Sequence, residues 1–250
     1  MKIWQLFENF NLAELNANFA ELLASVNGAK ATYLTANKTV YVATTGSDTT
    51  GNGTSGNPYK TIAKGLSAIP KNLNGYDAYL YIAGGTYPEN VLVKGNQGGL
   101  LRIILQGNVT LNSFSTSVCQ YITLSASTAA TMTITNTTGS SLYIRFASNV
   151  RFESTITLTI NSAITVFGIV CGSCSNLSID GTATVNNAGW AVYSETNTRV
   201  FIQNLLGTGN INGLSMEDGT IFSYGTKTIS AGTEKVLSGG SIITNLITMP

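Results

Sequence analysis

The sequence predicts an all-β protein, a right-handed parallel β-helix in which short strands stack turn upon turn as a solenoid. From about residue 100, short runs of alternating apolar and polar residues are separated by Gly, Asn and Ser, and helical periodicity is absent. The clearest runs begin at residues 101, 121, 142, 164, 177, 199 and 221, so five of the six steps measure 20 to 22 residues. A repeat of that length is typical of solenoids, because each turn buries its apolar side chains only with the help of the next turn.

The composition supports this fold class and excludes several functions. Apolar residues make up 43% of the 250, enough for a large core, while charged residues make up 10% and the formal net charge is +1. A chain this neutral lacks the basic field that holds nucleic acid, so we expect no nucleic-acid partner. The chain also has no His, which removes His general bases and the commonest zinc ligand.

Residues 1–27 differ from the rest and predict a short N-terminal α-helix. Apolar residues recur there with spacings of 3, 4, 3 and 4, the seam of a coiled coil, at Leu12, Leu15, Phe19, Leu22 and Val26. Two heptads are too short to be stable alone, so we interpret the segment as an anchor and trimerisation helix. One amphipathic helix packed on its own domain is the alternative.

Residues 28–99 predict the entry to the solenoid. Strands are expected at 39–44 and 79–83, with a capping helix near 58–69 between them, because prolines stand where that helix would open and stop.

The loop before this helix, Gly51 to Gly56, has the glycine spacing of a dinucleotide-binding fingerprint. Six polar residues separate the preceding strand from the first glycine, and the following strand ends without the carboxylate that would bind a ribose. We therefore expect a turn at this loop and no cofactor.

Residues 100–225 predict the turns of the solenoid, and residues 226–250 predict C-terminal strands. Alternation in the turns places Ile103, Ile144, Leu158 and Ile202 inward and Arg102, Arg145, Thr157 and Gln203 outward. The single step of 13 residues indicates an irregular turn or an outward loop near residues 168–190. A two-sheet sandwich also uses regular short strands, but the repeat spacing favours the solenoid.

One stretch of the entry region, residues 40–93, resembles a known superfamily. The likeness is carried by Tyr41-Val-Ala-Thr-Thr-Gly-Ser-Asp48, Gly51, Pro58-Tyr-Lys-Thr-Ile62, Leu80-Tyr-Ile82 and Gly85-Thr-Tyr-Pro-Glu-Asn-Val-Leu-Val93. These residues resemble the opening of the pectate-lyase-like β-helix superfamily. The resemblance implies an extended strand, a glycine-rich loop and a capping helix before the first turns. A helix suits that place, because the end of a solenoid exposes unpaired strand edges.

The N-terminal segment carries a second resemblance. Phe7-Glu-Asn-Phe10 and Glu14-Leu-Asn-Ala-Asn-Phe-Ala-Glu-Leu22 resemble the opening of bacteriophage tail-fibre and tailspike proteins. This resemblance implies a structural virion protein that forms a homotrimer, joins other virion proteins through residues 1–27 and binds a host surface polysaccharide or receptor. Two alternatives stay open: a polysaccharide-degrading tailspike, either glycoside hydrolase or lyase, and a decoration or connector protein of the head or tail.

The sequence also indicates where the protein is made. Its start, Met1-Lys2-Ile3-Trp4, lacks the apolar run of a signal peptide, and no run is long enough to cross a membrane. We expect synthesis in the host cytoplasm, a place on the virion and no membrane insertion. Three cysteines, Cys119, Cys171 and Cys174, are an odd number and indicate no disulfide framework.

Acidic residues are sparse in the solenoid, and the catalytic candidates are Asp180, Glu195, Glu217 and Asp218. Glycoside hydrolysis needs two carboxyl groups about 5 to 9.5 Å apart. Asp180 with Glu195, or Glu195 with Glu217 or Asp218, would meet that requirement if the turns align. Solvated turn residues are the simpler interpretation, so we favour a protein that is not an enzyme and expect no metal site.

Trp190 and Tyr193 lie close together in sequence, between two of these acids. An aromatic face beside polar groups is how proteins hold sugars, because the ring packs on apolar C–H groups while carboxylates and amides bind hydroxyls. In a trimer the same rings would instead fill a subunit interface. Both interpretations stay open.

Overall fold

The computed structural model describes residues 33–163, 166–173, 175–217, 219–223, 225–237 and 241–244, together with residues 16 and 19. The chain divides into two units, residues 1–32 and residues 33–250. In the first unit Asn16 and Phe19 are helical, and the Phe19 ring is exposed. The other residues of the predicted seam, Leu12, Leu15, Leu22 and Val26, lie outside the described residues.

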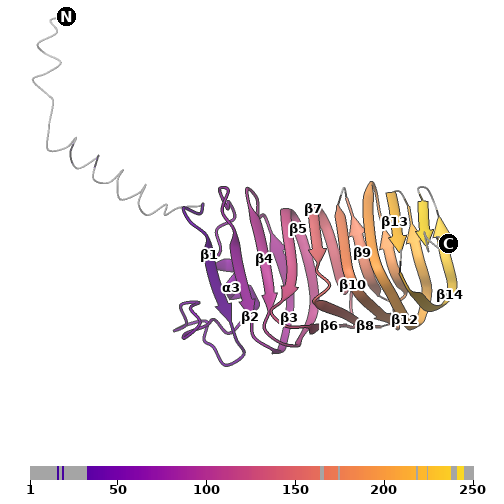
Figure 1. Cartoon of the computed structure of the whole chain (residues 1–250), viewed down its shortest axis with the longest axis horizontal. Coiled ribbons are helices and arrows are strands. Elements are labelled where there is room, and N and C mark those ends of the chain that lie inside the picture. The colour runs from indigo at the N-terminus through magenta and orange to yellow at the C-terminus, as the bar shows by residue number, and fades with distance from the viewer. Residues whose placement is uncertain are drawn as a thin grey trace, which may run out of the picture. The chain divides into compact units, whose positions relative to one another are not determined.

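The second unit is a parallel β-solenoid, as the sequence predicts (Figure 1). Its strands are β1 (Lys38–Val42), β2 (Ala78–Ile82), β3 (Gly85–Lys94), β4 (Leu100–Leu105), β5 (Val109–Ala126), β6 (Ala130–Asn136), β7 (Leu142–Phe152), β8 (Ile156–Ser162), β9 (Phe167–Gly172), β10 (Asn176–Asn186), β11 (Trp190–Ser194), β12 (Thr198–Met216), β13 (Gly219–Ser223), β14 (Lys227–Leu237) and β15 (Ser241–Thr244). These strands pair in parallel, each with its equivalent on the next turn. This pattern excludes the two-sheet sandwich, whose sheets are antiparallel.

The strands form three faces. Face 1 consists of β1, β2, β4, the last residues of β5 and β7, the first residues of β10 and β12, β13 and β15. Face 2 consists of the start of β3 and of β5, then β6, β8, the end of β10, the middle of β12 and the start of β14. Face 3 consists of the end of β3, the middle of β5, the start of β7, β9, β11, and the ends of β12 and β14.

The strand starts that were aligned in sequence belong to two different faces. Those at 101, 121, 177, 199 and 221 lie on face 1, whereas the one at 142 lies on face 3. The strand expected at 164 begins at Phe167 and also lies on face 3. The short step is therefore a return from face 3 to face 1. The irregularity that the structure has near residues 168–190 is a register shift between Ile179 and Thr182 in the pairing of β10 with β12. The long steps come earlier on face 1, 28 residues from Leu124 to Phe152 and 27 from there to Ile179.

A continuous core of apolar side chains fills the inside of the solenoid. All four residues predicted to point inward are at most 1% exposed, and all four predicted to point outward keep exposed surface. The alternation is therefore confirmed, and its cause is that successive side chains of a strand point to opposite sides. Neighbouring turns interlock in the core, as where the rings of Phe114 and Phe152 meet edge to face with centroids 6.3 Å apart.

Asparagine side chains join neighbouring turns at the corners. The Oδ1 atoms of Asn108, Asn186 and Asn204 each accept the backbone N–H group of a Thr on the following turn. Asn210 reaches back instead and accepts the N–H group of Ala188. A corner interrupts the strand ladder, so its backbone groups need side-chain partners. The Asn residues that separate the strands in sequence are therefore needed to bind backbone N–H groups at the corners.

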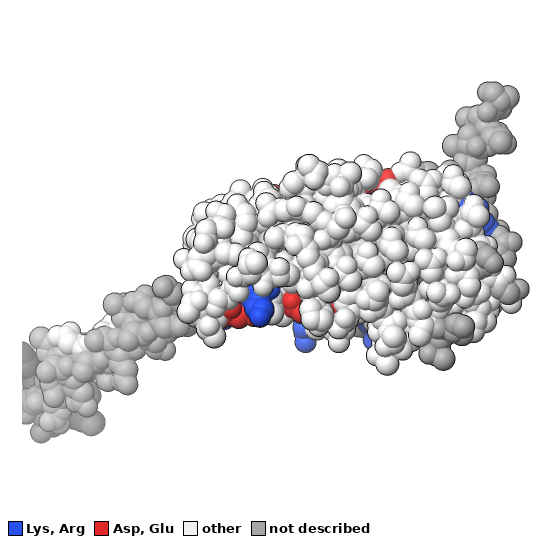
Figure 2. Space-filling view, turned by 90° about the horizontal axis from the view of Figure 1, so that it is seen from below, with Lys and Arg blue, Asp and Glu red and all other residues white. Residues whose placement is uncertain are grey.

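Face 2 carries almost no charge. Threonines occupy equivalent outward positions on four successive turns, at Thr110, Thr133, Thr159 and Thr184. Figure 2 views the solenoid from the side on which β6 and β8 lie in Figure 1, and most of that surface has no charged side chain. Thr suits this place, because its branched side chain favours strands and its hydroxyl supplies polarity. Lys227, at the start of β14, is an exception, and most of the described charged residues lie on the other faces and at the ends.

The capping helix is present but shorter than predicted. It is α3 (Ile62–Ser67), and the expected first turn at residues 58–60 is not helical. The N–H group of Tyr59 donates to the Tyr41 carbonyl, and its own carbonyl accepts the N–H group of Ala43. Because Tyr59 is bound to β1 and the residue after it through its backbone, the helix begins only beyond it.

Two carboxylates from other segments hold the start of α3. Asp48 accepts the N–H groups of Lys60 and Thr61 at 2.8 and 3.0 Å, and the Thr61 hydroxyl at 2.7 Å. Glu89 of β3 accepts the first two N–H groups of the helix, both at 2.9 Å. The first N–H groups of a helix have no partner inside it, so these carboxylates stabilise a helix of only six residues.

The glycine-rich loop folds on itself. The N–H group of Gly51 donates to the Ser47 carbonyl, and those of Asn52 and Gly53 both donate to the Asn57 carbonyl. In a dinucleotide site such N–H groups would face the pyrophosphate. Here they are used inside a turn, which is the interpretation that the sequence favoured.

Leu124→Ala should lower the free energy of unfolding by about 2–5 kcal/mol, because Leu124 is fully buried and the substitution leaves a cavity. Leu92→Ala is the matched control, since it removes the same atoms from a side chain that is 50% exposed. We expect it to change stability by no more than about 0.5 kcal/mol. Denaturant unfolding followed by circular dichroism measures both values. Equal losses would contradict the core position of Leu124.

Asp48→Asn should destabilise the protein in a pH-dependent way. Burial acts to raise the pKa of Asp48, but its hydrogen bonds from Thr61 and Lys60 and the nearby Lys64 bring the pKa below the ordinary value of 3.8. A carboxyl with a depressed folded-state pKa stabilises above its unfolded pKa, and that stability disappears as pH falls through the folded pKa. The deficit of the variant should therefore be full at neutral pH and shrink below about pH 3.8. Thermal unfolding across this range tests it; a deficit that stays constant would contradict the role of the charge.

Candidate functional site

Three aromatic rings gather on the outer side of face 3, and we call them the aromatic cluster: Phe167, Trp190 and Tyr193. Phe167 begins β9 and pairs with Trp190, the first residue of β11. The centroid of the Tyr193 ring lies 5.2 Å from that of Phe167 and 6.2 Å from that of Trp190. The rings are tilted by 43° and 45° to one another, so they form a continuous apolar surface and not a closed stack.

The register of the strands extends this surface toward β7. Val170 lies between Tyr143 and Tyr193, its partners on the two neighbouring turns. Although it lies on the outer side of the strand, Val170 is only 3% exposed. The flanking aromatic side chains cover it, and the aromatic cluster therefore rests on an apolar floor.

Two carboxylates border the aromatic cluster where face 3 ends. The N–H group of Glu195 donates to the Cys171 carbonyl, and that of Glu217 donates to the Ser194 carbonyl, so the two glutamates occupy the same corner on successive turns. Backbones of neighbouring turns are ~4.8 Å apart. The Tyr193 hydroxyl donates a hydrogen bond to Oε1 of Glu217, which ties one glutamate to the rings.

The environment of Tyr193 keeps its hydroxyl protonated. Burial, the hydrogen bond to Glu217 and the negative charges of Glu217 and Glu195 raise the pKa of Tyr193 to about 12. Burial and the charge of Glu195 also raise the pKa of Tyr143, against the opposing effect of Arg145. Glu195 thus acts on tyrosines of two different turns, and both hydroxyls are hydrogen-bond donors at neutral pH.

A cation completes the border. The guanidinium carbon of Arg145 lies 5.3 Å from the centroid of the Tyr143 ring and 5.4 Å from that of Phe146. Arg145 pairs with Gly172, and a side chain at Gly172 would collide with the Glu195 carboxylate. Glycine at this position therefore leaves the space that Glu195 occupies.

The structure separates one predicted catalytic pair and brings another together. Asp180 follows the face 1 strand of its turn, whereas Glu195 precedes the face 1 strand of the next turn, so they lie at opposite edges of that face. Asp180 instead forms an ion pair with Arg151, 2.5 Å between Oδ2 and Nε. The predicted pairing of Asp180 with Glu195 is therefore wrong. Glu195 and Glu217 do lie on adjacent turns, and Asp218 lies outside the described residues.

Other chemistry finds little support in the part of the chain that the structure describes. No group of three or more Cys, Asp or Glu side chains is placed there to hold a metal ion. Cys171 is buried, and burial together with Glu195 raises the pKa of its thiol to about 12; Cys174 lies outside these residues. None of the described helices is long and apolar enough to span a membrane.

Sequence reasoning named Trp190, Tyr193, Glu195 and Glu217 but missed Phe167, Tyr143 and Arg145 as their neighbours. The missed residues lie on earlier turns and come close only through the register of β7, β9 and β11. Aligning the runs at 142 and 167 with the one at 190, and not with those of face 1, is the signal that would have found them.

Comparison with known proteins does not add an identity. No family, no curated protein and no solved structure matches the chain. Fold and site together define a β-solenoid with an aromatic surface bordered by carboxylates.

Glu217→Gln should lower the pKa of Tyr193 from its value of about 12, because it removes the negative charge beside the hydroxyl. The tyrosinate absorbance measured during an alkaline titration gives the shift, once the titration of Tyr193→Phe is subtracted to isolate this residue. Lys94→Gln, a change on the exposed side of β3, is the control and should leave the curve unchanged. An unshifted Tyr193 in Glu217→Gln would show that the hydrogen bond does not form in solution.

Proposed function

We propose that this chain is a structural virion protein, a tail fibre or spike, that binds a glycan on the host surface through the aromatic cluster of face 3. The observation that carries the proposal is the combination of three rings with carboxylates at their border. Trp190, Phe167 and Tyr193 offer an apolar surface of tilted rings, and Glu195 and Glu217 offer acceptors beside it.

This arrangement suits a sugar ring for a physical reason. One side of a sugar ring exposes apolar C–H groups, which pack on an aromatic face, while its hydroxyls point outward to hydrogen-bond partners. Glu195 accepts hydrogen bonds from hydroxyls and the Tyr143 hydroxyl donates one, while the Tyr193 oxygen, whose proton is bonded to Glu217, accepts one. The apolar floor at Val170 supports the rings from below, so the surface is formed before the ligand arrives and little ordering is required.

The sequence supports the place of this protein on a virion. Residues 1–27 resemble the attachment and trimerisation segments of bacteriophage tail fibres and tailspikes. In a homotrimer three shallow sites bind one surface together, so weak single contacts give firm adhesion through their effective concentration. We therefore propose that residues 1–27 join other virion proteins and assemble the trimer, and that the solenoid faces the host.

A polysaccharide-degrading spike is the second candidate, favoured by one observation. Glu195 and Glu217 occupy the same corner on successive turns, a backbone spacing of ~4.8 Å, and glycoside hydrolases need two carboxyl groups about 5 to 9.5 Å apart. One oxygen of Glu217 is already bound to the Tyr193 hydroxyl, however. Binding without cleavage accounts for this hydrogen bond more simply, because the bond orients the Tyr193 hydroxyl and the Glu217 carboxylate toward a ligand.

Trp190→Ala should reduce binding of the purified full chain to host capsule or lipopolysaccharide at least tenfold, because it removes the largest of the three rings. Tyr76→Ala, which removes an exposed ring from the segment before β2 instead, is the matched control and should change binding less than twofold. Surface plasmon resonance measures binding, and light scattering measures the mass of each variant. A mass near three chains for wild type and both variants supports the proposal. Unchanged binding in Trp190→Ala would refute it, a lower mass would make the cluster a subunit interface, and release of oligosaccharide would favour the enzyme.

A further inference from the structure

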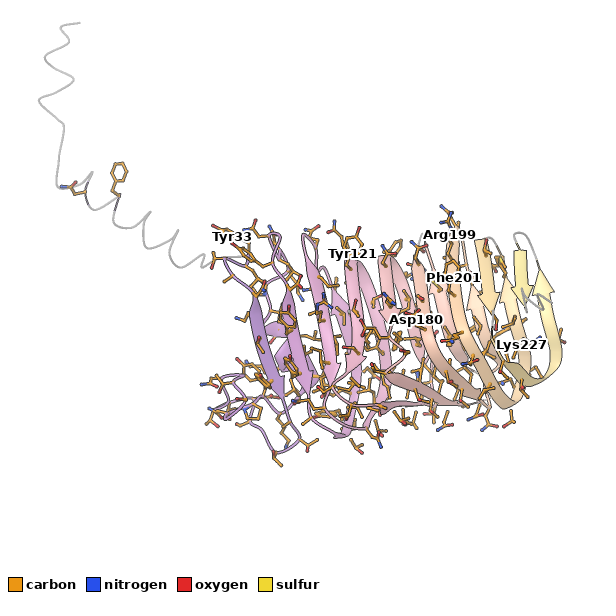
Figure 3. The ribbon with its side chains drawn as sticks, in the orientation of Figure 1. Tyr33, Tyr121, Asp180, Arg199, Phe201 and Lys227 are labelled. Atoms are coloured by element: carbon orange, nitrogen blue, oxygen red, sulfur yellow. The ribbon has the colours of Figure 1, made fainter. Side chains whose placement is uncertain are left out.

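Face 1 carries a groove that lies apart from the aromatic cluster. It has a volume of about 350 Å³ and is lined by residues of β7, β10 and β12, among them Asn149, Arg151, Asn176, Ser178, Arg199 and Phe201. A smaller hollow of about 260 Å³ adjoins it on the other side of Arg151 and is lined in part by Tyr121. Figure 3 shows Tyr121, Asp180, Arg199 and Phe201 along this side of the solenoid.

Strand register and side-chain size explain the groove. Arg151, Ser178 and Phe201 occupy equivalent positions on three successive turns, and so do Asn149, Asn176 and Arg199. The middle turn thus carries a small residue, Ser178, where its neighbours carry Arg and Phe. Its strand, β10, becomes the floor, while β7 and β12 form the walls, two strand spacings or ~9.6 Å apart.

The two arginines of the groove differ in what they already bind. The Arg151 guanidinium pairs with Asp180 at 2.5 Å, and the Ser178 hydroxyl donates to the other oxygen of the same carboxylate, also at 2.5 Å. Arg199 is exposed, and among the described residues no carboxylate pairs with its guanidinium. Only 10% of the residues of this chain are charged, so an exposed arginine that lines a groove and has no carboxylate partner among the described residues is an unusual feature of this surface.

Phe201 places an apolar surface beside this cation. It follows Arg199 by two residues on β12, so both side chains point outward from the same strand, ~6.7 Å apart along it. The amide of Asn176 and the hydroxyl of Ser178 lie on the neighbouring strand. The groove therefore presents a guanidinium, an aromatic ring and neutral polar groups on two neighbouring strands.

We propose that this groove binds an acidic sugar unit of a polysaccharide, a uronic acid or a related carboxylate-bearing sugar. Arg199 binds the carboxylate with two parallel N–H···O hydrogen bonds, a geometry that suits the planar guanidinium. Phe201 packs on the C–H side of the ring, and Asn176 bonds to hydroxyls. Asp180 holds Arg151 in place and repels a second anion, which selects a polymer with spaced charges over one with dense charges.

The test is binding of the purified full chain to oligomers of glucuronic acid, measured by isothermal titration calorimetry. Carboxyl-reduced oligomers, which keep the sugar rings but lack the charge, are the matched ligand control. We expect them to bind at least tenfold more weakly, and binding of the acidic oligomers should weaken as salt is added. Arg199→Gln should lose at least tenfold in affinity and Phe201→Ala several-fold, with unchanged circular dichroism.

Arg102→Gln is the matched protein control, because Arg102 also points outward on face 1 but pairs with Asp77 at 3.4 Å and does not line the groove. It should change affinity less than twofold. Equal binding of acidic and reduced oligomers, or full affinity in Arg199→Gln, would overturn the proposal. Dextran sulfate tests general attraction of anions. If it binds Arg199→Gln as well as wild type, that attraction does not depend on Arg199 and the proposal is also overturned. A lower mass of Arg199→Gln by light scattering would instead show that the groove is a contact between copies.

This inference does not depend on the aromatic cluster. Trp190→Ala should leave the affinity for glucuronic acid oligomers, which bind face 1, unchanged. Arg199→Gln should leave the binding of neutral glycans to the aromatic cluster of face 3 unchanged. Failure of one site is therefore distinguishable from failure of the other.

Discussion

In-register pairing of parallel strands between successive turns is the constraint on which the rest of this structure depends. Along face 1 it brings Leu124, Phe152 and Ile179 together although 28 and 27 residues separate them in sequence. The same pairing fixes which side chains point inward, because a shift by one residue would turn the core outward. Every outer surface is consequently a set of columns, and the chemistry of each column depends on one residue from each turn.

This constraint lets a chain with few charges carry distinct surfaces. Face 2 presents threonines at equivalent positions and almost no charge. Face 3 presents rings beside the carboxylates of Glu195 and Glu217, and face 1 presents arginines beside Phe201. Since the buried core residues stabilise the solenoid, the residues at outward positions can differ between faces without loss of the fold. The proposed glycan contacts use two of these faces, and each combines a ring with polar groups of a different charge.

The ends and corners follow from the same need to satisfy the backbone. Where the strand ladder stops, asparagine amides such as that of Asn108 accept N–H groups of the next turn. At the entry, α3 covers the first turns, and Asp48 and Glu89 bind the N–H groups at its start. Asp48 belongs to the loop that precedes the helix, and Glu89 belongs to β3. The helix is therefore stable only when that loop and β3 are in place.

The sequence by itself determined the parallel solenoid, the inward and outward alternation and the presence of a capping helix, because these depend on local periodicity and composition. It also singled out Trp190, Tyr193, Glu195 and Glu217, which are close along the chain or one turn apart. The tertiary structure alone decided which face each strand joins, since strands of all three faces have the same apolar pattern. For that reason the run at 142 was aligned with the wrong face, Asp180 was paired with Glu195 and not with Arg151, and Phe167 and Arg199 gained their roles only from register.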